Sequence, residues 1–337
     1  MNRATTYATV LTLISFFLLL WGLTLGSADI PISEIASVIG GKGSPTAQFI
    51  VLETRLPALL TAMLAGASLS VSGLLMQTCF ANPLAGPSIM GISSGSSLGV
   101  ALVMMLGASY VGLWGNIAIV TGAFAGAMVV LVILLLFSSI VKSSEVLLIL
   151  GILIGYLTSS AISLLNYFAP EKAVHNFVIW GMGNFSSVHL SILPWFAALS
   201  VILMGLAMLY IRSLNVLLFG MEYARSAGIR PGRVRNGLMT ISGALTAVVT
   251  AWCGPIGFLG LVIPHIARML LSTSNHRVVL PITILTGAAT GILCQVISVL
   301  PSCRIPGSIP INAITPIIGV PVIIYVMLNR RRLLYFN

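Results

Sequence analysis

Few residues of this 337-residue chain could break or form bonds, and none has the spacing of a catalytic site. Ser93, Ser94 and His265 could supply a nucleophile and a general base, but nothing in their spacing favours that arrangement. The chain lacks a Gly-x-x-x-x-Gly-Lys-[Ser/Thr] phosphate-binding loop. Its four cysteines lack metal-ligand spacing, so we expect buried free thiols and no metal site. The sequence therefore predicts no catalytic residue in this chain.

The composition is that of an integral membrane protein. Apolar residue types make up 58% of the chain and charged types 7%, whereas soluble domains carry about 25% charged residues. A soluble fold with so few charges would expose large apolar patches. The net charge of +10 could suggest a nucleic-acid partner, but the basic residues lie between apolar runs and form no single field, so none is predicted.

Apolar runs of about 20 residues predict helices that cross a membrane. We expect an all-α fold with ten such spans in a single transmembrane domain over residues 1–337. The spans are placed at 8–26, 57–78, 91–107, 113–137, 146–168, 191–211, 236–253, 256–271, 279–300 and 313–328. The run 8–26 lacks the small-residue cleavage site of a signal peptide, so it is taken as a span.

Two of these runs, 91–107 and 313–328, are short and rich in glycine or proline, which predicts half-length or broken helices. Small residues also recur at intervals of four, which predicts close helix packing. These pairs are Gly66 and Ser70, Gly122 and Gly126, and Gly151 and Gly155.

Positive charge favours an orientation with both chain ends in the cytoplasm. In that orientation the inner face holds twelve of the sixteen basic residues: Arg3, Lys142, Arg212, Arg225, Arg230, Arg233, Arg235, Arg268, Arg277, Arg330, Arg331 and Arg332. The outer face keeps Lys42, Arg55, Lys172 and Arg304. This distribution follows the positive-inside rule.

A polar break follows the second predicted span. The segment Asn82-Pro83-Leu84-Ala85 separates two helices, and Pro83 cannot continue the first of them. The Asn82 amide can bond to backbone groups that such a break frees. The segment fits either a re-entrant or gating loop or an ordinary Asn-Pro turn between spans.

The largest inner loop contains a short amphipathic helix, expected at about 218–230. It includes Gly220, Glu222, Ala224 and Arg225 and ends at Gly228. Such a helix on the cytoplasmic face could dock a soluble partner. Alternatively, the basic residues of the loop serve only to fix the topology.

A third segment, residues 254–268, is dense in glycine and proline. Gly257 and Gly260 come before Pro264 and His265, which predicts a tight turn followed by a kinked helix. His265 is expected to be a hydrogen-bonded structural residue.

In their order and spacing, these three segments resemble the permease family of ABC importers for iron-siderophore, haem and vitamin B12. The resemblance covers about residues 52–332. It includes an Arg-Leu-Pro start at Arg55, the Asn-Pro-Leu-Ala loop, the Pro-His segment and a closing Gly319-Val320-Pro321. Met221 and Ala227 depart from the family pattern in the amphipathic helix, and Asn312 departs near the last span.

The resemblance implies partners for the two faces. Two cytoplasmic ATPases, which bind ATP and Mg²⁺, would dock on the helix from Gly220 to Gly228, and this chain would hold no cofactor. Arg55 would pair with acidic residues of a periplasmic or lipid-anchored binding protein. A second permease copy would complete the translocation path. The cytoplasmic gate would consist of Asn82, Leu84, Ser143 and Ser144.

The function expected is that of the transmembrane permease subunit of an ATP-binding-cassette importer in the bacterial inner membrane. An iron-siderophore-type metal chelate is the first expected substrate, and vitamin B12 and haem are alternatives. An ion-coupled secondary transporter would need an ion site at mid-membrane, but all six acidic residues lie in or near loops.

Overall fold

The structure is a computed structural model that describes residues 3–106, 113–141, 143–303 and 307–328. These residues form helices joined by turns and loops, with no β-strand among them. The elements are α1 (Arg3–Thr24), α2 (Ile32–Ile39), α3 (Pro45–Gln48), η1 (Phe49–Arg55), α4 (Leu56–Cys79), α5 (Ile92–Leu106), α6 (Leu113–Ile140), α7 (Ser144–Phe168), α8 (Glu171–Gly181), η2 (Phe185–Ser187), α9 (Leu193–Leu209), α10 (Ile211–Leu217), α11 (Met221–Ser226), α12 (Pro231–Cys253), α13 (Leu259–Leu271), α14 (His276–Val299), η3 (Leu300–Cys303) and α15 (Ile311–Leu328).

A helix of the described chain lies at each of the ten predicted spans. Seven are long and apolar enough to cross a membrane, or eight if the pair α9 and α10, bent by 53°, is counted as one span. The apolar helices α5 and α13 have only 15 and 13 residues. At 1.5 Å per residue they extend about 22 Å and 20 Å, less than the roughly 30 Å hydrocarbon core. The all-α membrane fold and the short helix after residue 91 are therefore confirmed.

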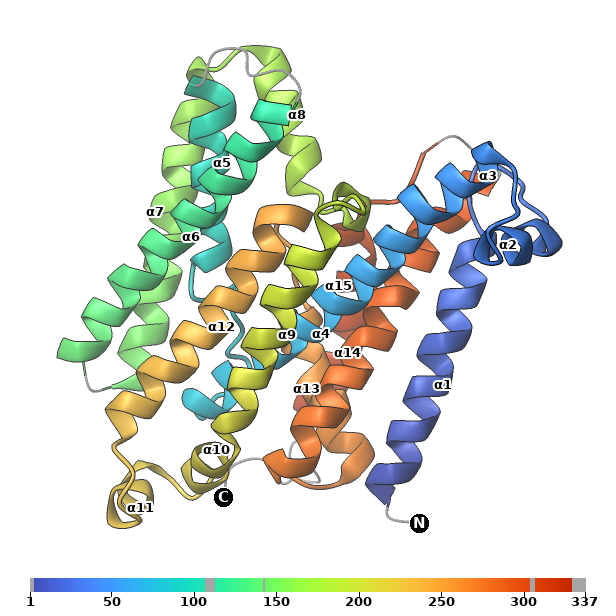
Figure 1. Ribbon diagram of the computed structural model, residues 1–337. Helices are drawn as coiled ribbons and strands as arrows, with labels where there is room; N and C mark the ends of the chain where they lie inside the picture. The colour runs from blue at the N-terminus through green and yellow to red at the C-terminus, as the bar shows by residue number, and fades with distance from the viewer. Residues whose placement is uncertain (1–2, 107–112, 142, 304–306, 329–337) are drawn as a thin grey trace.

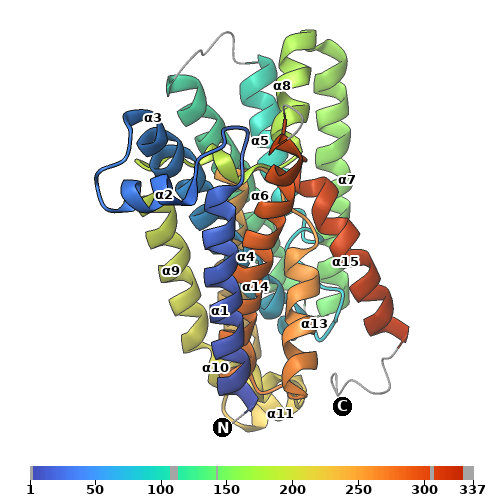
Figure 2. The same cartoon turned by 90° about the vertical axis from the view of Figure 1, so that its right-hand side faces the viewer.

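The spanning helices lie side by side in one bundle, with α4 at its centre (Figures 1 and 2). Twenty of the 24 residues of α4 are buried, whereas α7 has four buried residues among 25. The helix α11 lies at the same end of the bundle as the start of α1, and we call this the α11 end (Figure 1). The short helices α2, α3 and α8 lie at the opposite end.

Glycine lets the neighbours of α4 approach its backbone directly. A Cβ added at Gly66 would overlap the carbonyl oxygen of Gly287 in α14. A Cβ at Gly73 would likewise overlap the carbonyl oxygen of Gly260 in α13. Gly260 is the residue four positions before Pro264, so its carbonyl has lost its normal helical donor. The close packing predicted from Gly66 and Ser70 is confirmed, because Ser70 also contacts Gly287.

The other small-residue pairs also lie at close helix contacts. Gly122 and Gly126 of α6 face Gly99 and Gly95 of α5. Gly151 of α7 faces Met90, at the end of the loop that leads into α5, whereas Gly155 has only a distant contact with Ser94. Small residues thus hold the half-length helix α5 between α6 and α7.

Hydroxyl groups join α4 to α12 inside the bundle. Ser72 Oγ lies 2.6 Å from Ser242 Oγ and 3.0 Å from Thr246 Oγ1, and all three residues are buried. Such interhelical hydrogen bonds add to the packing that holds membrane helices together. The predicted buried free thiols are also found at Cys79, Cys253 and Cys294.

Replacement of Gly73 by alanine tests the close contact of α4 with α13. The added methyl group meets a backbone carbonyl that cannot rotate away, so we expect the free energy of unfolding to fall by roughly 1–3 kcal/mol. The matched control is Gly205→Ala in α9, where a Cβ would meet nothing within 4 Å. Thermal unfolding of the detergent-solubilised protein measures both, and equal midpoints for the two variants would contradict the packing account.

Candidate functional site

The predicted docking helix is present as α11, at one end of the bundle. Ala224 is fully buried and belongs to the same apolar cluster as Leu214 and Leu217 of α10. Glu222 and Arg225 are exposed, so the helix rests on the bundle through one face and presents the other. At six residues it is shorter than the predicted 218–230.

Two glycines delimit α11. Gly220 has φ 97° and Gly228 has φ 79°, a region that other residues enter only with strain. Neither would meet another atom within 4 Å if it carried a Cβ. Their role is therefore in the backbone turns that set the direction of the helix.

An exposed aromatic pair lies beside α11 and was not predicted from the sequence. The rings of Phe219 and Tyr223 are 5.3 Å apart between centroids, and the residues are 69% and 56% exposed. Aromatic side chains of this kind often supply much of the binding energy of a protein interface. The sequence sign of this pair is the spacing of four residues between Phe219 and Tyr223, which brings the two rings together across the start of α11.

The loop of residues 80–91 begins where α4 ends, in the half of the bundle that includes the α11 end (Figure 1). The Asn82 side chain accepts a hydrogen bond from the Leu84 backbone N–H at 2.9 Å, and the Asn82 carbonyl accepts from Ala85 N–H at 3.1 Å. Ala81 has φ 47°, which turns the chain sharply after the helix. Leu84 is 36% exposed at the tip of this closed turn.

Buried polar side chains hold this loop against α13. His265 Nε2 lies 2.8 Å from the carbonyl oxygen of Pro83, and because a carbonyl only accepts, Nε2 carries the hydrogen. Gln77 accepts from Arg268 Nη1 at 2.7 Å and donates to the carbonyl of Leu261 at 2.9 Å. His265 is thus hydrogen-bonded as expected, and its structural role stays a prediction.

Ser143 and Ser144, the other predicted gate residues, lie at the start of α7. Ser143 caps this helix, because its Oγ accepts from the Val146 backbone N–H at 3.3 Å. Ser143 is exposed and Ser144 is partly exposed. The far end of the 80–91 loop packs against the same helix, α7, at Gly151.

Known proteins share this arrangement of helices. The sequence pattern of the FecCD transport family matches residues 11–329. The chain belongs to the FecCD transport family. The matched range includes the 80–91 loop, α11 and the Pro264-His265 segment, so the family covers all of the site described above.

Curated relatives and a solved structure agree with this assignment. The vitamin B12 import system permease protein BtuC of Shigella boydii is 33% identical over 298 residues, which cover 87% of this chain and 88% of that protein. The protein of the same name from Escherichia coli O9:H4 is 33% identical over 293 residues, 86% of each chain. An inward-facing structure of a metal-chelate type ABC transporter has a TM-score of 0.84 and 29% identity, and covers 97% of this chain and 99% of its own.

This chain is therefore the permease subunit of an ABC importer of the FecCD and BtuC type. In this family the ATPase activity resides on a separate partner. Docking of that partner at the α11 end stays a prediction.

Arg55 lies at the opposite end, where its guanidinium group donates within the chain. Nη1 donates to the Leu23 carbonyl at 2.7 Å and Nη2 to the Ala28 carbonyl at 2.5 Å. Leu23 is in the last turn of α1, so Arg55 satisfies a helix-end carbonyl and complements the helix dipole. The residue is half-buried, and its contact with a binding protein stays a prediction.

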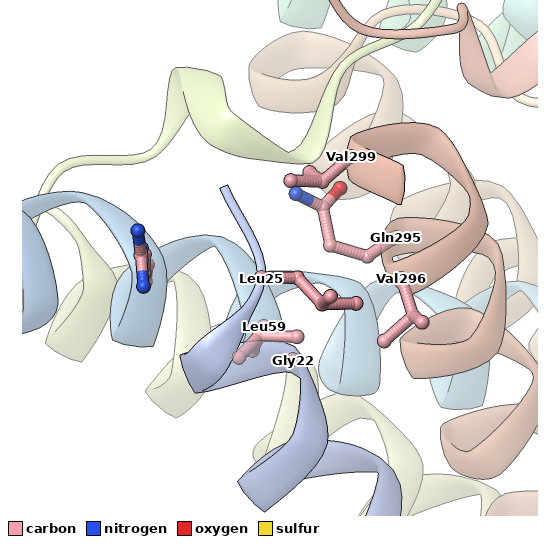
Figure 3. Close-up of a pocket in the computed structure, with 7 residues that line it drawn as sticks. Gly22, Leu25, Leu59, Gln295, Val296 and Val299 are labelled. Atoms are coloured by element: carbon pink, nitrogen blue, oxygen red, sulfur yellow. The ribbon is translucent and has the colours of Figure 1, made fainter. Parts of the chain in front are cut away.

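Arg55 also lines two adjoining pockets. The smaller lies between α1, α4 and α14, where Leu25 and Gln295 approach from opposite sides (Figure 3). The larger, of about 270 Å³, adds polar residues to these walls: Ser27, Thr54, Ser186 and Ser302. This end of the bundle therefore has a polar recess beside Arg55.

Arg235 was expected to be one of the basic residues of the inner face, and the structure shows that it is also buried. It is 6% exposed, and its guanidinium donates to the carbonyls of Ser138 and Val141 at the end of α6. The described chain thus uses Arg235 to cap a helix. The sequence gives no sign of this, because the two segments are almost 100 positions apart.

Asn312, a departure from the family pattern, joins three segments at the opposite end. Its Nδ2 donates to the carbonyls of Gly181 and Pro255, and its Oδ1 accepts from Gly257 N–H at 3.2 Å. A glycine at this position could not make these bonds. Gly257, which was expected to lie in a tight turn, is in the turn before α13.

Charge reversal at Arg225 tests α11 as a docking surface. Because Arg225 is exposed and Ala224 faces inward, Arg225→Glu should leave the fold intact and raise the dissociation constant for the partner ATPase by about tenfold. Arg3→Glu, at the same end but in α1, is the matched control. Equal affinity of the Arg225→Glu and Arg3→Glu variants would count against the assignment.

Two substitutions separate the structural and docking roles of Arg55. Both Arg55→Gln and Arg55→Glu remove the two bonds to carbonyls, so both should lower the midpoint of thermal unfolding. If Arg55 also contacts acidic residues of a binding protein, only Arg55→Glu should add repulsion and raise the dissociation constant several-fold further. Lys42→Glu, an exposed site at the same end, serves for comparison. Equal dissociation constants for the two Arg55 variants would rule out the docking role.

Proposed function

We propose that this chain, as a single transmembrane domain, is the permease of an ABC importer in the bacterial inner membrane, with the α11 end in the cytoplasm. Charge supports this orientation. The described residues at the α11 end include eight arginines: Arg3, Arg212, Arg225, Arg230, Arg233, Arg235, Arg268 and Arg277. The only acidic residues described there are Glu145 and Glu222. By the positive-inside rule this end faces the cytoplasm, together with both termini.

The observation that carries a transport role is a polar stripe on α7. Tyr156, at the middle of this 25-residue helix, is 70% exposed. Ser160, Ser163 and Tyr167 continue the same helix face and are exposed as well. A phenol group at the centre of a bilayer is unfavourable against lipid. The stripe is therefore best explained as the wall of a water-filled path.

A second copy of the chain would close this path. The stripe belongs to a helix with four buried residues, so most of α7 is open to a neighbour. Two copies with their α7 stripes facing each other would enclose a channel with hydroxyl groups and aromatic rings along its wall. A wall with weak contacts suits passage of a large substrate, because tight binding would slow release.

The two ends of the bundle would receive different partners. An ATPase dimer, which binds ATP and Mg²⁺, would dock on the two copies of α11, with Gly220 and Gly228 setting the helix direction. A periplasmic or lipid-anchored binding protein would deliver the substrate at the opposite end, near Arg55. Asn82, Leu84, Ser143 and Ser144 would then form the gate on the cytoplasmic side.

A metal chelate is the substrate class that we propose. The sequence led us to expect an iron-siderophore-type chelate, with haem as an alternative. The relatives named for vitamin B12 import favour that cobalt chelate as a second candidate. All three are large, and the polar, uncharged stripe on α7 fits each of them.

Uptake by the reconstituted permease, its ATPase and its binding protein tests the proposal. The panel contains labelled ferric siderophores, haem and vitamin B12. We expect one of these to accumulate in proteoliposomes only when ATP is hydrolysed, and an ATPase that cannot hydrolyse ATP is the control. Uptake driven by an ion gradient without the ATPase would overturn the proposal.

A further inference from the structure

We propose that Asn215, His276, Gln77 and His265 are positioning residues that transmit movement from α11 to the 80–91 loop. This inference rests on the proposed function, in which the ATPase moves α11 and the loop belongs to the gate. None of the four contacts the translocated substrate in this account. They form two groups of hydrogen bonds that meet at the buried end of α4.

The first group attaches α10, the helix that precedes α11, to the start of α14. Asn215 Oδ1 accepts from the His276 backbone N–H at 2.7 Å, and Asn215 Nδ2 donates to Asn275 Oδ1 at 2.9 Å. Asn275 is the N-cap of α14, where it accepts from Arg277 N–H at 3.0 Å. Only residues 218–220 separate α10 from α11, so a displacement of α11 acts on this attachment directly.

His276 carries the connection from α14 to α4. Its Nδ1 lies 3.0 Å from Asn215 Oδ1, an oxygen that already accepts, so Nδ1 carries a hydrogen. Its Nε2 lies 2.9 Å from Thr78 Oγ1, in the last turn of α4. His276 has no exposed surface, and Thr78 is 2% exposed. Burial of both residues strengthens the contact between His276 and Thr78.

The second group begins one residue earlier in α4. Gln77 has no exposed surface and joins α4 to α13 through Leu261 and Arg268. From α13, His265 reaches the carbonyl of Pro83 in the loop. The Asn82 backbone N–H also donates to the carbonyl of Gln77, at 3.1 Å. The exposed tip at Leu84 is therefore held by both α4 and α13.

The two groups form a continuous series of contacts through adjacent residues of α4, Gln77 and Thr78. The contacts of Gln77, Thr78 and His276 lie inside the bundle, where all three side chains are buried, so a shift there displaces packed neighbours. Physical continuity alone does not demonstrate coupling between two places. A double-mutant cycle does, because independent sites would give additive effects.

The cycle combines Asn215→Leu and His265→Phe in the complete transporter. Asn215→Leu removes the three hydrogen bonds of the Asn215 side chain at similar size, and His265→Phe removes the donor to Pro83. We expect each to lower the number of substrate molecules transported per ATP hydrolysed by at least about fivefold, the low end of typical coupling between sites. The double variant should be no lower than the worse single variant.

A matched control and a conservative variant separate positioning from folding. Asn236→Leu removes another interhelical bond of the α11 end, the one from Ser138 Oγ at 2.6 Å, and should leave the ratio unchanged. Asn215→Asp keeps the oxygen that accepts from His276, so it should restore most of the ratio lost in Asn215→Leu. All variants are compared in complexes with the parent content of ATPase and the parent midpoint of unfolding. If Asn215→Leu falls short, Thr78→Val, which removes the contact with His276 Nε2 at similar size, takes its place in the cycle.

A second readout follows the loop itself. In a Leu84→Cys background, the rate of maleimide labelling is measured without nucleotide and with ATP and vanadate. We expect the nucleotide-dependent change to shrink at least about fivefold when Asn215→Leu is added. An unchanged labelling response, an unchanged ratio in Asn215→Leu, or additive effects in the double variant would overturn the inference. ATP-dependent uptake by the parent would still stand, so failure of the inference differs from failure of the proposed function.

Discussion

Direct backbone contact between α4 and its neighbours is the constraint on which the rest of this structure depends. Lipid does not drive apolar helices together, so their association relies on close packing and on hydrogen bonds between them. Gly66, Gly73, Gly260 and Gly287 supply that packing, because each lacks the side chain that would separate two helices. The hydroxyl groups around Ser72 add bonds at the same depth. With α4 fixed in this way, its last turn has a defined position.

The site at the α11 end follows from that position. Gln77 and Thr78 are the last polar residues before α4 ends, and their side chains contact α13 and α14. The 80–91 loop then begins at a rigid point and ends against α7 at Gly151. A loop held at both ends can change conformation only if the helices around it move. The proposed gate is thus controlled by helix positions, and α11 lies at the end where a partner could change them.

The sequence was sufficient for the features that depend on local pattern. Run length predicted the positions of ten helices, of which seven or eight are long enough to cross a membrane. Glycine spacing predicted packed faces, and amphipathic character predicted a short helix where α11 lies. Polar contacts between distant segments could not be predicted in the same way. Asn215 and His276 are 61 positions apart, and Gln77 and Arg268 are 191 positions apart. The burial of Arg235 could not be predicted for the same reason, since its carbonyl partners come close only after α6 and α12 have packed.

Hydrogen–deuterium exchange on the transporter in lipid nanodiscs tests the central claim most directly, namely that the loop responds to the partner while the α4 contacts stay fixed. The amides of Leu84 and Ala85 should exchange at different rates with and without trapped ATP, because both are bonded within the turn at Asn82. The amides of Gly66 to Gly73 should stay equally protected in both states. Equal loop exchange in the two states, or a nucleotide-dependent change spread along α4, would contradict this account.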